Sequence, residues 1–294
     1  MRILITGITG FLGTSIAESL RASFPDATVV GVAPNLAHPV DLTDAAAAQT
    51  AVEQARPTHV VHAAGGHGQM EVRQQFDLHC LATENLLRAL GRIGPAPVFI
   101  NVGSAAQYGL RDDATPLSES APDRPAGPYG VSKVAQELLV AAAERRGIVR
   151  ATYLRVFNPI GPGQGPAMLV PTIVAQLRAA QTDLASVVLG NLDDERDYLD
   201  VRDVGAAIAA CLADERARGE RFNICSGIST SVRALAEALA RAAGLRLSLS
   251  SKNPSPARPS YSCGDPAKLS ARLGVRPKIA LEATLDAIWS SASR

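Results

Sequence analysis

The 294-residue chain carries 29 basic and 28 acidic side chains, and this net charge of +1 leaves no basic surplus for binding nucleic acid. No uninterrupted run approaches the roughly 18 apolar residues of a membrane-spanning helix, and the N-terminus lacks the charged region of a signal peptide, so we expect no membrane partner. The four cysteines show no CxxC or Cys/His pairing, which argues against a zinc site or a disulfide framework and favours the cytoplasm.

Short apolar runs alternate with longer Ala- and Leu-rich helical patterns along the first half of the chain. The pattern predicts strands over residues 2–7, 28–32, 59–65, 98–104 and 149–156. Such alternation is typical of βαβ units, and strands of a parallel sheet are apolar throughout because helices cover both faces. The predicted fold class is therefore α/β, a doubly wound parallel sheet of the Rossmann type.

The rhythm changes after Asn158 to a Pro/Gly loop, "NPIGPGQGPAM". A helical pattern follows over 170–180, and the apolar run 186–191 is a candidate to return to the sheet. Further helices are expected over 231–243 and 281–290. We predict a dinucleotide-binding domain over 1–157 plus about 187–224, and a smaller discontinuous lobe over about 158–186 plus 225–294.

A glycine-rich segment, "TGITGFLG", follows the first strand and opens the first helix. Gly7, Gly10 and Gly13 permit a tight turn and a close approach of a pyrophosphate to the helix N-terminus, with Phe11 and Leu12 at the mouth of that helix. The spacing is GxxGxxG, whereas most dehydrogenases carry GxGxxG. The alternative is a turn that merely needs positive φ, but a strand before and a helix after favour dinucleotide binding.

The second strand ends without the acidic residue that binds the ribose 2′-hydroxyl of NAD. Ala33 stands about 20 residues beyond the glycines, where Asp or Glu is expected, so nothing repels a 2′-phosphate and NADP is preferred over NAD. No arginine replaces the acid nearby, so NAD stays open. In "PVDLTD", Asp41 beside Leu42 either faces the adenine or caps the helix that follows.

Three further residues form a candidate catalytic group. Hydride transfer to a ketone requires a proton for the oxygen, and a tyrosine near pKa 10 supplies it poorly unless a cation stabilises the phenolate. In "GPYGVSK", Tyr129 and Lys133 lie one helical turn apart on one face. Ser104, at the end of the fourth strand, is placed to bind the same oxygen. YxxxK alone arises readily by chance; the combination with the glycine loop does not.

These motifs resemble the extended short-chain dehydrogenase/reductase family, whose members mostly act on nucleotide sugars. The segments "TGITGFLG", "VVHAAG", "GSAAQYG", "GPYGVSK", "RVFNPIGPGQ", "ERDYLDVRDV", "FNICSG" and "RPSYSCGDPAKL" occur in family order and span nearly the whole chain. The resemblance assigns catalysis to Ser104, Tyr129 and Lys133. It also places Ala63, Ala64 and Gly65, with Tyr129 and Lys133, at the cofactor.

The resemblance also bears on the reaction. The 4,6-dehydratases carry an Asp-Glu pair where this chain has Ala105 and Ala106, so dehydration is not expected. The 4-epimerases usually keep the ribose carboxylate that Ala33 lacks. The run "LGNLDDERDYLDVRDV" looks most like the GDP-4-keto-6-deoxymannose reductases. We predict an NADPH-dependent reductase of the C4 ketone of a GDP- or dTDP-linked 4-keto-6-deoxyhexose. The alternatives are a 4-epimerase with tightly bound NAD and a non-catalytic dinucleotide-binding regulator.

By the same resemblance, Asn158 is expected to contact the sugar or a phosphate, and Arg196 and Arg258 the diphosphate, for which a guanidinium is well suited. Arg196 lies in the charged run "DDERD", so the alternative is a solvated loop paired with its own carboxylates. His62 and His67 lack a third ligand at suitable spacing, so no metal is expected.

The resemblance also implies that two copies of the chain associate through helices. The helix after Gly127 has an apolar face from Val134, Leu138, Leu139 and Ala142. Relatives pair this helix and the preceding one into a four-helix dimer interface, so we expect a homodimer; otherwise both helices merely cover the sheet.

Overall fold

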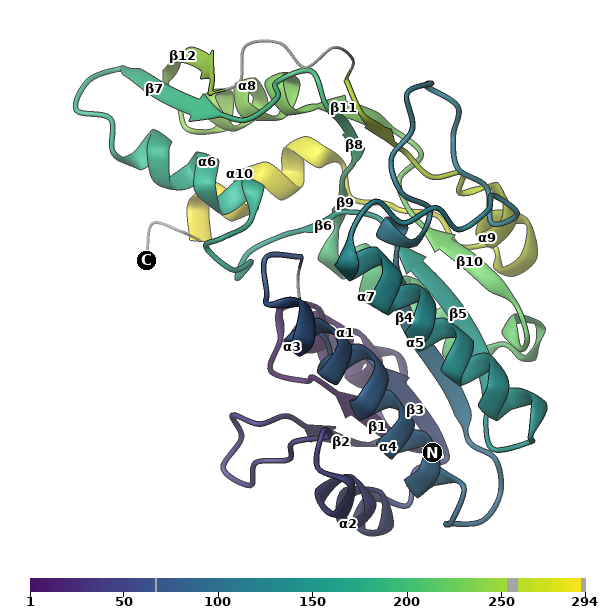
Figure 1. Ribbon diagram of the computed structural model, residues 1–294. Coiled ribbons are helices and arrows are strands. Elements are labelled where there is room, and N and C mark those ends of the chain that lie inside the picture. The colour runs from purple at the N-terminus through teal and green to yellow at the C-terminus, as the bar shows by residue number, and fades with distance from the viewer. Residues whose placement is uncertain (67, 253–258, 292–294) are drawn as a thin grey trace.

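A six-stranded, wholly parallel sheet forms the larger part of the computed structural model, which describes residues 1–66, 68–252 and 259–291 (Figure 1). The five strands predicted for this sheet are confirmed, and a sixth, β10, joins its edge. In order across the sheet the strands are β2 (Thr28–Val32), β1 (Arg2–Thr6), β3 (His59–His62), β4 (Val98–Ser104), β5 (Arg150–Val156) and β10 (Arg221–Ile224).

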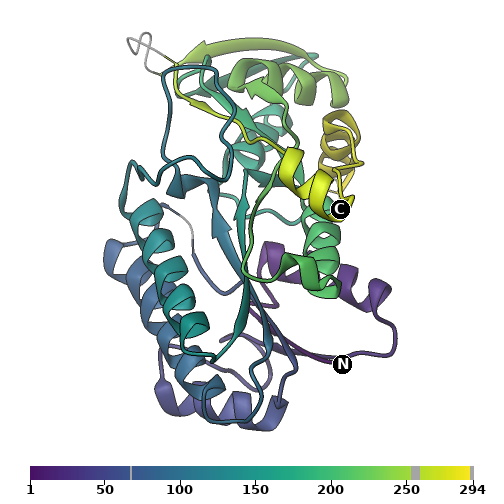
Figure 2. The same ribbon diagram turned by 90° about the vertical axis from the view of Figure 1, so that its right-hand side faces the viewer.

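Helices cover both faces of this sheet, as Figure 2 shows from its edge. The first face carries α2 (Ala45–Ala55), α3 (Val72–Phe76), the π-helical turn η1 (Asp77–Leu81), α4 (Ala82–Leu90) and α5 (Pro128–Arg145). The second face carries α1 (Phe11–Ser23), α7 (Val201–Ala213) and α9 (Ala267–Leu273). Short 3-10 turns, η2 (Ala105–Gln107) and η3 (Glu215–Ala217), follow β4 and α7.

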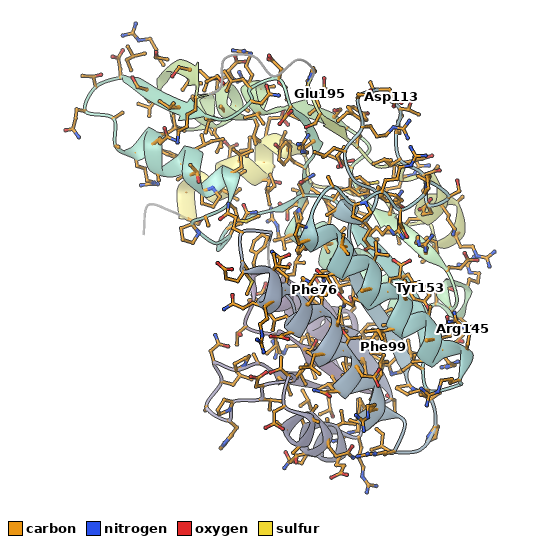
Figure 3. All side chains as sticks on the ribbon, in the orientation of Figure 1. Phe76, Phe99, Asp113, Arg145, Tyr153 and Glu195 are labelled. Atoms are coloured by element: carbon orange, nitrogen blue, oxygen red, sulfur yellow. The ribbon has the colours of Figure 1, made fainter. Side chains whose placement is uncertain are left out.

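The strands alternate their side chains between these two layers, since successive residues of a strand point to opposite faces. Leu4, Val60 and Phe99 pack under α2, α4 and α5, while Ile5 and Ile100 pack under α1 and α7. Figure 3 labels Phe99 in the buried layer and Arg145 at the exposed end of α5. Coverage of both faces explains why these strands are mostly apolar, and the predicted doubly wound fold is confirmed.

A smaller lobe lies beyond the carboxyl ends of the strands (Figure 1). Its apolar core is formed by α6 (Leu169–Arg178), β7 (Leu184–Leu189), α8 (Val232–Ala242), β12 (Arg246–Ser251) and α10 (Leu281–Ser291). The expectation that the run 186–191 returns to the large sheet is wrong: β7 pairs in parallel with β12. Its buried residues alternate, because only one face of this two-stranded sheet is covered. The division into two domains at the residues given above stays a prediction.

Two small sheets connect the lobe to the large sheet. They contain β8 (Glu195–Asp197), β11 (Ser229–Ser231) and β13 (Tyr261–Ser262) in one, and β6 (Pro159–Ile160) and β9 (Leu199–Asp200) in the other. The fully buried carboxylate of Asp197 accepts hydrogen bonds from the backbone nitrogens of Ser226, Gly227 and Gly264 at 2.8–3.3 Å. Because a buried carboxylate needs several donors, this one residue ties three separate segments together.

Candidate active site

The glycine-rich loop after β1 lies against the end of β3, where the order of strands reverses. Gly7 has φ +70°, and a Cβ there would lie 2.8 Å from the Ala64 Cα. At Gly13 a Cβ would lie 2.0 Å from the Gly7 carbonyl oxygen. Only glycine fits either position, so the turn brings α1 to the sheet as closely as a backbone can approach.

The N-terminus of α1 leaves backbone donors available for an anion. Its N-cap, Gly10, offers no side-chain hydrogen bond, and no acidic residue stands in the first turn. Phe11 and Leu12 begin this helix and are partly buried. Unpaired N–H groups at a helix N-terminus with a tight glycine turn are the arrangement that binds a pyrophosphate, so this loop fits a dinucleotide.

The segment after β2 carries no acidic side chain toward this loop. Ala33 is buried, and its carbonyl oxygen accepts a hydrogen bond from the Val40 nitrogen at 3.1 Å. Asn35, two residues further on, bonds to Thr9 of the glycine loop at 2.5 Å. The segment therefore offers neutral polar groups where NAD-specific sites hold a carboxylate.

Asp41 does not cap the next helix. Its carboxylate accepts hydrogen bonds from the backbone nitrogen and hydroxyl of Thr43, at 2.9 and 2.7 Å. The cap of α2 is Asp44, which accepts from the nitrogens of Ala46 and Ala47. Leu42 is buried, and its carbonyl oxygen is bound by the Asn85 side chain at 2.9 Å. The capping alternative for Asp41 is thus wrong, and its contact with adenine stays a prediction.

Ser104 and Tyr129 come together at the end of β4. Pro128 at the first helical position after Gly127 starts α5, so Tyr129 lies in its first turn. Burial raises the pKa of the Tyr129 phenol, and a side-chain hydrogen bond with Ser104 opposes that rise. The Ser104 hydroxyl also accepts from the Ala106 nitrogen at 3.2 Å. The phenol is therefore protonated near neutral pH, as a proton donor must be.

Lys133 is buried one helical turn further on, with 5% of its surface exposed. Its Nζ donates to the Val102 carbonyl oxygen at 3.1 Å and to Gln136 Oε1 at 2.9 Å. A Cβ built on Gly65 would lie 3.4 Å from the same Nζ, so the ammonium group borders the loop after β3. Burial lowers the pKa of Lys133 to about 8. Its expected effect on the Tyr129 phenolate stays a prediction.

His79, on the π-helical turn, also contacts Tyr129, and the sequence analysis missed it. The two rings meet edge to face with centroids 5.4 Å apart. His79 Nε2 accepts from the Gly66 nitrogen at 3.2 Å, and Nδ1 lies 2.8 Å from the Ser132 hydroxyl, which donates to the Tyr129 carbonyl oxygen. Burial and the Lys133 charge lower its pKa to about 2, so the imidazole is neutral.

Two of the predicted substrate residues lie at the small connecting sheets, Asn158 just before β6 and Arg196 in β8. Asn158 Nδ2 donates to the Asp197 carbonyl oxygen at 2.9 Å. The Arg196 guanidinium donates to the carbonyl oxygen and hydroxyl of Ser260, at 2.8 and 2.9 Å, and is 3.6 Å from Asp194. These contacts hold Arg196 beside residue 260, and its contact with a diphosphate stays a prediction. Arg258 and His67 lie outside the described residues.

The sequence of the chain matches the family described as NAD dependent epimerase/dehydratase over residues 3–225. The chain belongs to this family. The resemblance to extended short-chain dehydrogenase/reductases is thereby confirmed.

Three relatives in the epimerase/dehydratase family are informative. GDP-6-deoxy-D-mannose reductase of Pseudomonas aeruginosa is 30% identical over all of this chain and 98% of its own length. The solved structure of RMD from Pseudomonas aeruginosa, complexed with NADPH, has a TM-score of 0.86, 27% identity and full coverage of both chains. UDP-glucose 4-epimerase of Mycolicibacterium smegmatis is 27% identical over 83% of each chain.

Replacing Gly13 by alanine should weaken dinucleotide binding strongly, because the new Cβ would displace the Gly7 carbonyl and open the turn. We expect NADPH affinity, measured by fluorescence titration, to fall by roughly two orders of magnitude or more. Gly190→Ala is the matched control, since a Cβ there meets nothing within 4 Å. Wild-type affinity in Gly13→Ala would show that the cofactor binds elsewhere.

Proposed function

We propose that this chain reduces the C4 ketone of a nucleotide-linked 4-keto-6-deoxyhexose with NADPH. The observation that carries the proposal is the protonated Tyr129 phenol beside Ser104, together with a glycine loop that has no acidic partner at Ala33. Full-length similarity to a GDP-6-deoxy-D-mannose reductase supports the substrate class, and the NADPH of the solved relative supports the cofactor.

Each residue has one task in this proposal. The dinucleotide, when bound, supplies the hydride. Ser104 donates a hydrogen bond that orients the substrate carbonyl, and Tyr129 releases its proton to the carbonyl oxygen as that oxygen becomes an alcohol. The positive charge of Lys133 favours the phenolate that is left behind. Asn158, Arg196 and Arg258 are proposed to hold the sugar and diphosphate.

The second candidate is a nucleotide-sugar 4-epimerase, which the similarity to UDP-glucose 4-epimerase favours. An epimerase would retain NAD through purification and interconvert sugars without net consumption of cofactor. The absence of an acidic residue at Ala33 disfavours an epimerase, because a carboxylate at that position holds the ribose of NAD.

Turnover tests the proposal directly. We expect NADPH oxidation with GDP- or dTDP-4-keto-6-deoxyhexose, and Tyr129→Phe should reduce kcat by roughly three orders of magnitude while leaving NADPH affinity nearly unchanged. Phenylalanine keeps the ring packing against His79 and removes only the proton donor.

Two results would contradict the proposal. One is a failure to oxidise NADPH with every such substrate, and the other is full activity in Tyr129→Phe. NADPH binding without any turnover would favour the regulator instead.

The pH dependence of reduction follows from Lys133. Its ammonium group is charged below its pKa of about 8 and loses its proton above that value. We therefore expect kcat/KM for NADPH to fall above about pH 8, since neutral Lys133 no longer stabilises the Tyr129 phenolate. Rate measurements between pH 6 and 10 check this, and a flat profile would show that the charge of Lys133 plays no part.

We also propose a cytoplasmic homodimer. Val131 and Leu138 of α5 and Leu81 of η1 are 43%, 63% and 45% exposed, so these helices keep apolar side chains on their outer face. All four cysteines are free thiols, which supports the cytoplasmic location. No described helix is long and apolar enough to cross a membrane. We expect a dimeric mass by light scattering, and a monomeric mass for Leu138→Arg. A monomeric wild type at micromolar concentration would contradict the dimer.

A further inference from the structure

Three residues on one face of α5 contact the end of β4. Tyr129, Lys133 and Glu137 follow one another at intervals of four, so their side chains share a face. Tyr129 lies beside Ser104, and Lys133 Nζ donates to the Val102 carbonyl oxygen. Glu137 Oε2 accepts from Gln107 Nε2 at 2.7 Å. The third residue therefore belongs to the same polar contact as the two proposed catalytic ones.

Gln107 links Glu137 to the backbone of Ser104. Its side-chain Oε1 accepts a hydrogen bond from the Ser104 nitrogen at 2.9 Å, while its Nε2 donates to the carboxylate. The side chain is fully buried, and a Cβ on Gly103 would lie 2.4 Å from Oε1, so the amide packs directly on the strand. If the Gln107 amide were flipped, its NH₂ group would face the Ser104 N–H and its oxygen would face the Glu137 carboxylate. Both partners therefore fix its orientation.

Glu137 is a buried carboxylate that keeps its charge. Arg155, which is fully buried, donates to it at 3.1 and 3.4 Å, and Arg221 donates through Nε at 3.0 Å and through Nη2. Burial would raise the pKa of Glu137, but these guanidiniums and the Gln107 amide hold it below its usual value. A charged acceptor makes its hydrogen bonds shorter and stronger than a neutral one does.

We propose that Glu137 is a positioning residue for Ser104 and acts through Gln107. This inference rests on the proposed function, in which the Ser104 hydroxyl orients the substrate carbonyl. The Gln107 amide fixes the backbone of Ser104, the Ala106 nitrogen binds its hydroxyl, and the charge of Glu137 holds the amide in place. Loss of that charge should release Ser104 without disturbing the glycine loop that binds the dinucleotide.

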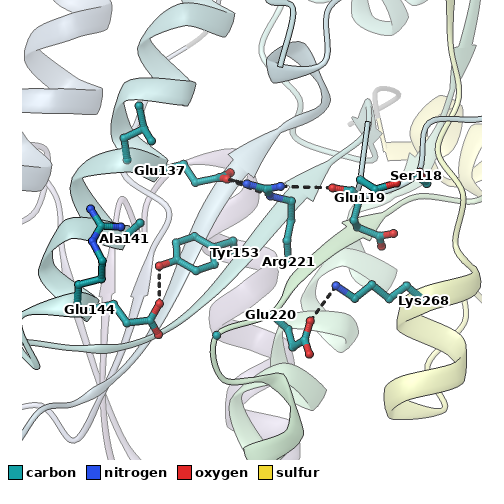
Figure 4. A pocket seen from close by; sticks show the side chains of 13 residues that line it. Ser118, Glu119, Glu137, Ala141, Glu144, Tyr153, Glu220, Arg221 and Lys268 are labelled. Carbon is teal, nitrogen blue, oxygen red and sulfur yellow. Dashed lines mark hydrogen bonds and ion pairs between the residues drawn. The ribbon is translucent and has the colours of Figure 1, made fainter. Parts of the chain in front are cut away.

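The far side of this network borders a pocket of about 630 Å³ (Figure 4). Arg221 lies between the Glu137 carboxylate and the Glu119 carbonyl oxygen, to which it donates at 3.3 Å. Glu144 lies two turns along α5 in the same pocket, where it accepts from the Tyr153 hydroxyl at 2.7 Å and the Ala151 nitrogen at 2.8 Å. Because these two partners lie on β5, Glu144 is a matched control for Glu137.

A double-mutant cycle tests the link. Gln107→Glu places two carboxylates side by side, and Glu137→Gln removes the charge, so each should lower kcat roughly tenfold or more. The double variant reverses the pair: a carboxylate at 107 accepts from the Ser104 nitrogen and from the new amide at 137. We expect it to recover kcat to within a few-fold of wild type. Glu144→Gln should keep wild-type kcat, and NADPH affinity should stay constant throughout.

A second measurement does not depend on turnover. The ¹³Cζ resonance of Tyr129, assigned from its absence in Tyr129→Phe, reports the surroundings of the phenol hydroxyl, which include Ser104. It should move in both single variants, return in the double variant and stay unmoved in Glu144→Gln. If the wild type shows no turnover, the proposed function is refuted. This resonance would still decide whether Glu137 positions Ser104.

Should Glu137→Gln not fold, Gln107→Met removes only the link and keeps the pairs between Glu137 and the arginines. It should show the same loss of kcat and the same shift of the resonance. Wild-type kcat with an unmoved resonance in Gln107→Met would overturn the inference, as would a double variant no better than the worse single variant.

Discussion

The contact between α5 and the end of β4 determines the geometry of the site. Polar groups that leave water must find partners, and in this contact Lys133 binds a carbonyl oxygen of β4 while Glu137 binds the side chain of Gln107 in the turn after it. A slip of the helix by one residue would leave both without these partners. The polar contact therefore selects one register, whereas an apolar one tolerates several.

The reversal of strand order completes the site. Because β2 and β3 lie on opposite sides of β1, the loops after β1 and β3 meet at one edge of the sheet. Behind them, Thr6 and Thr83 each lie 2.8 Å from a nitrogen of buried His62, and Thr83 donates to the His79 carbonyl oxygen. Thr83 must then accept from His62 Nε2, which fixes the neutral tautomer. A series of hydrogen bonds therefore runs from Thr6, just before the glycine loop, through the π-helical turn to the backbone of Tyr129. Each bond in the series has only one possible donor.

Local patterns in the sequence predicted the central sheet, the glycine loop and the position of Tyr129 and Lys133 one turn apart on α5, because each depends on neighbours in the chain. The run at β7 was assigned to the wrong sheet. Its apolar residues alone do not distinguish a strand that is covered on both faces from a strand that is covered on a single face. Gln107 and Glu137 lie 30 residues apart, and His79 and Ser132 lie 53 apart. No local spacing indicates such pairs, because only the packing of α5 on the sheet brings them together.

The same contact bears on the direction of the chemistry. An alkoxide is a far stronger base than a phenolate, so a buried phenol with a raised pKa still gives its proton to a reduced carbonyl. The reverse step would begin from the phenolate, the form that the charge of Lys133 is proposed to favour. An epimerase must pass through both steps in one cycle, whereas a reductase needs only the first. What separates the two activities here is therefore the cofactor, because the uncharged surroundings of Ala33 favour one that carries a 2′-phosphate.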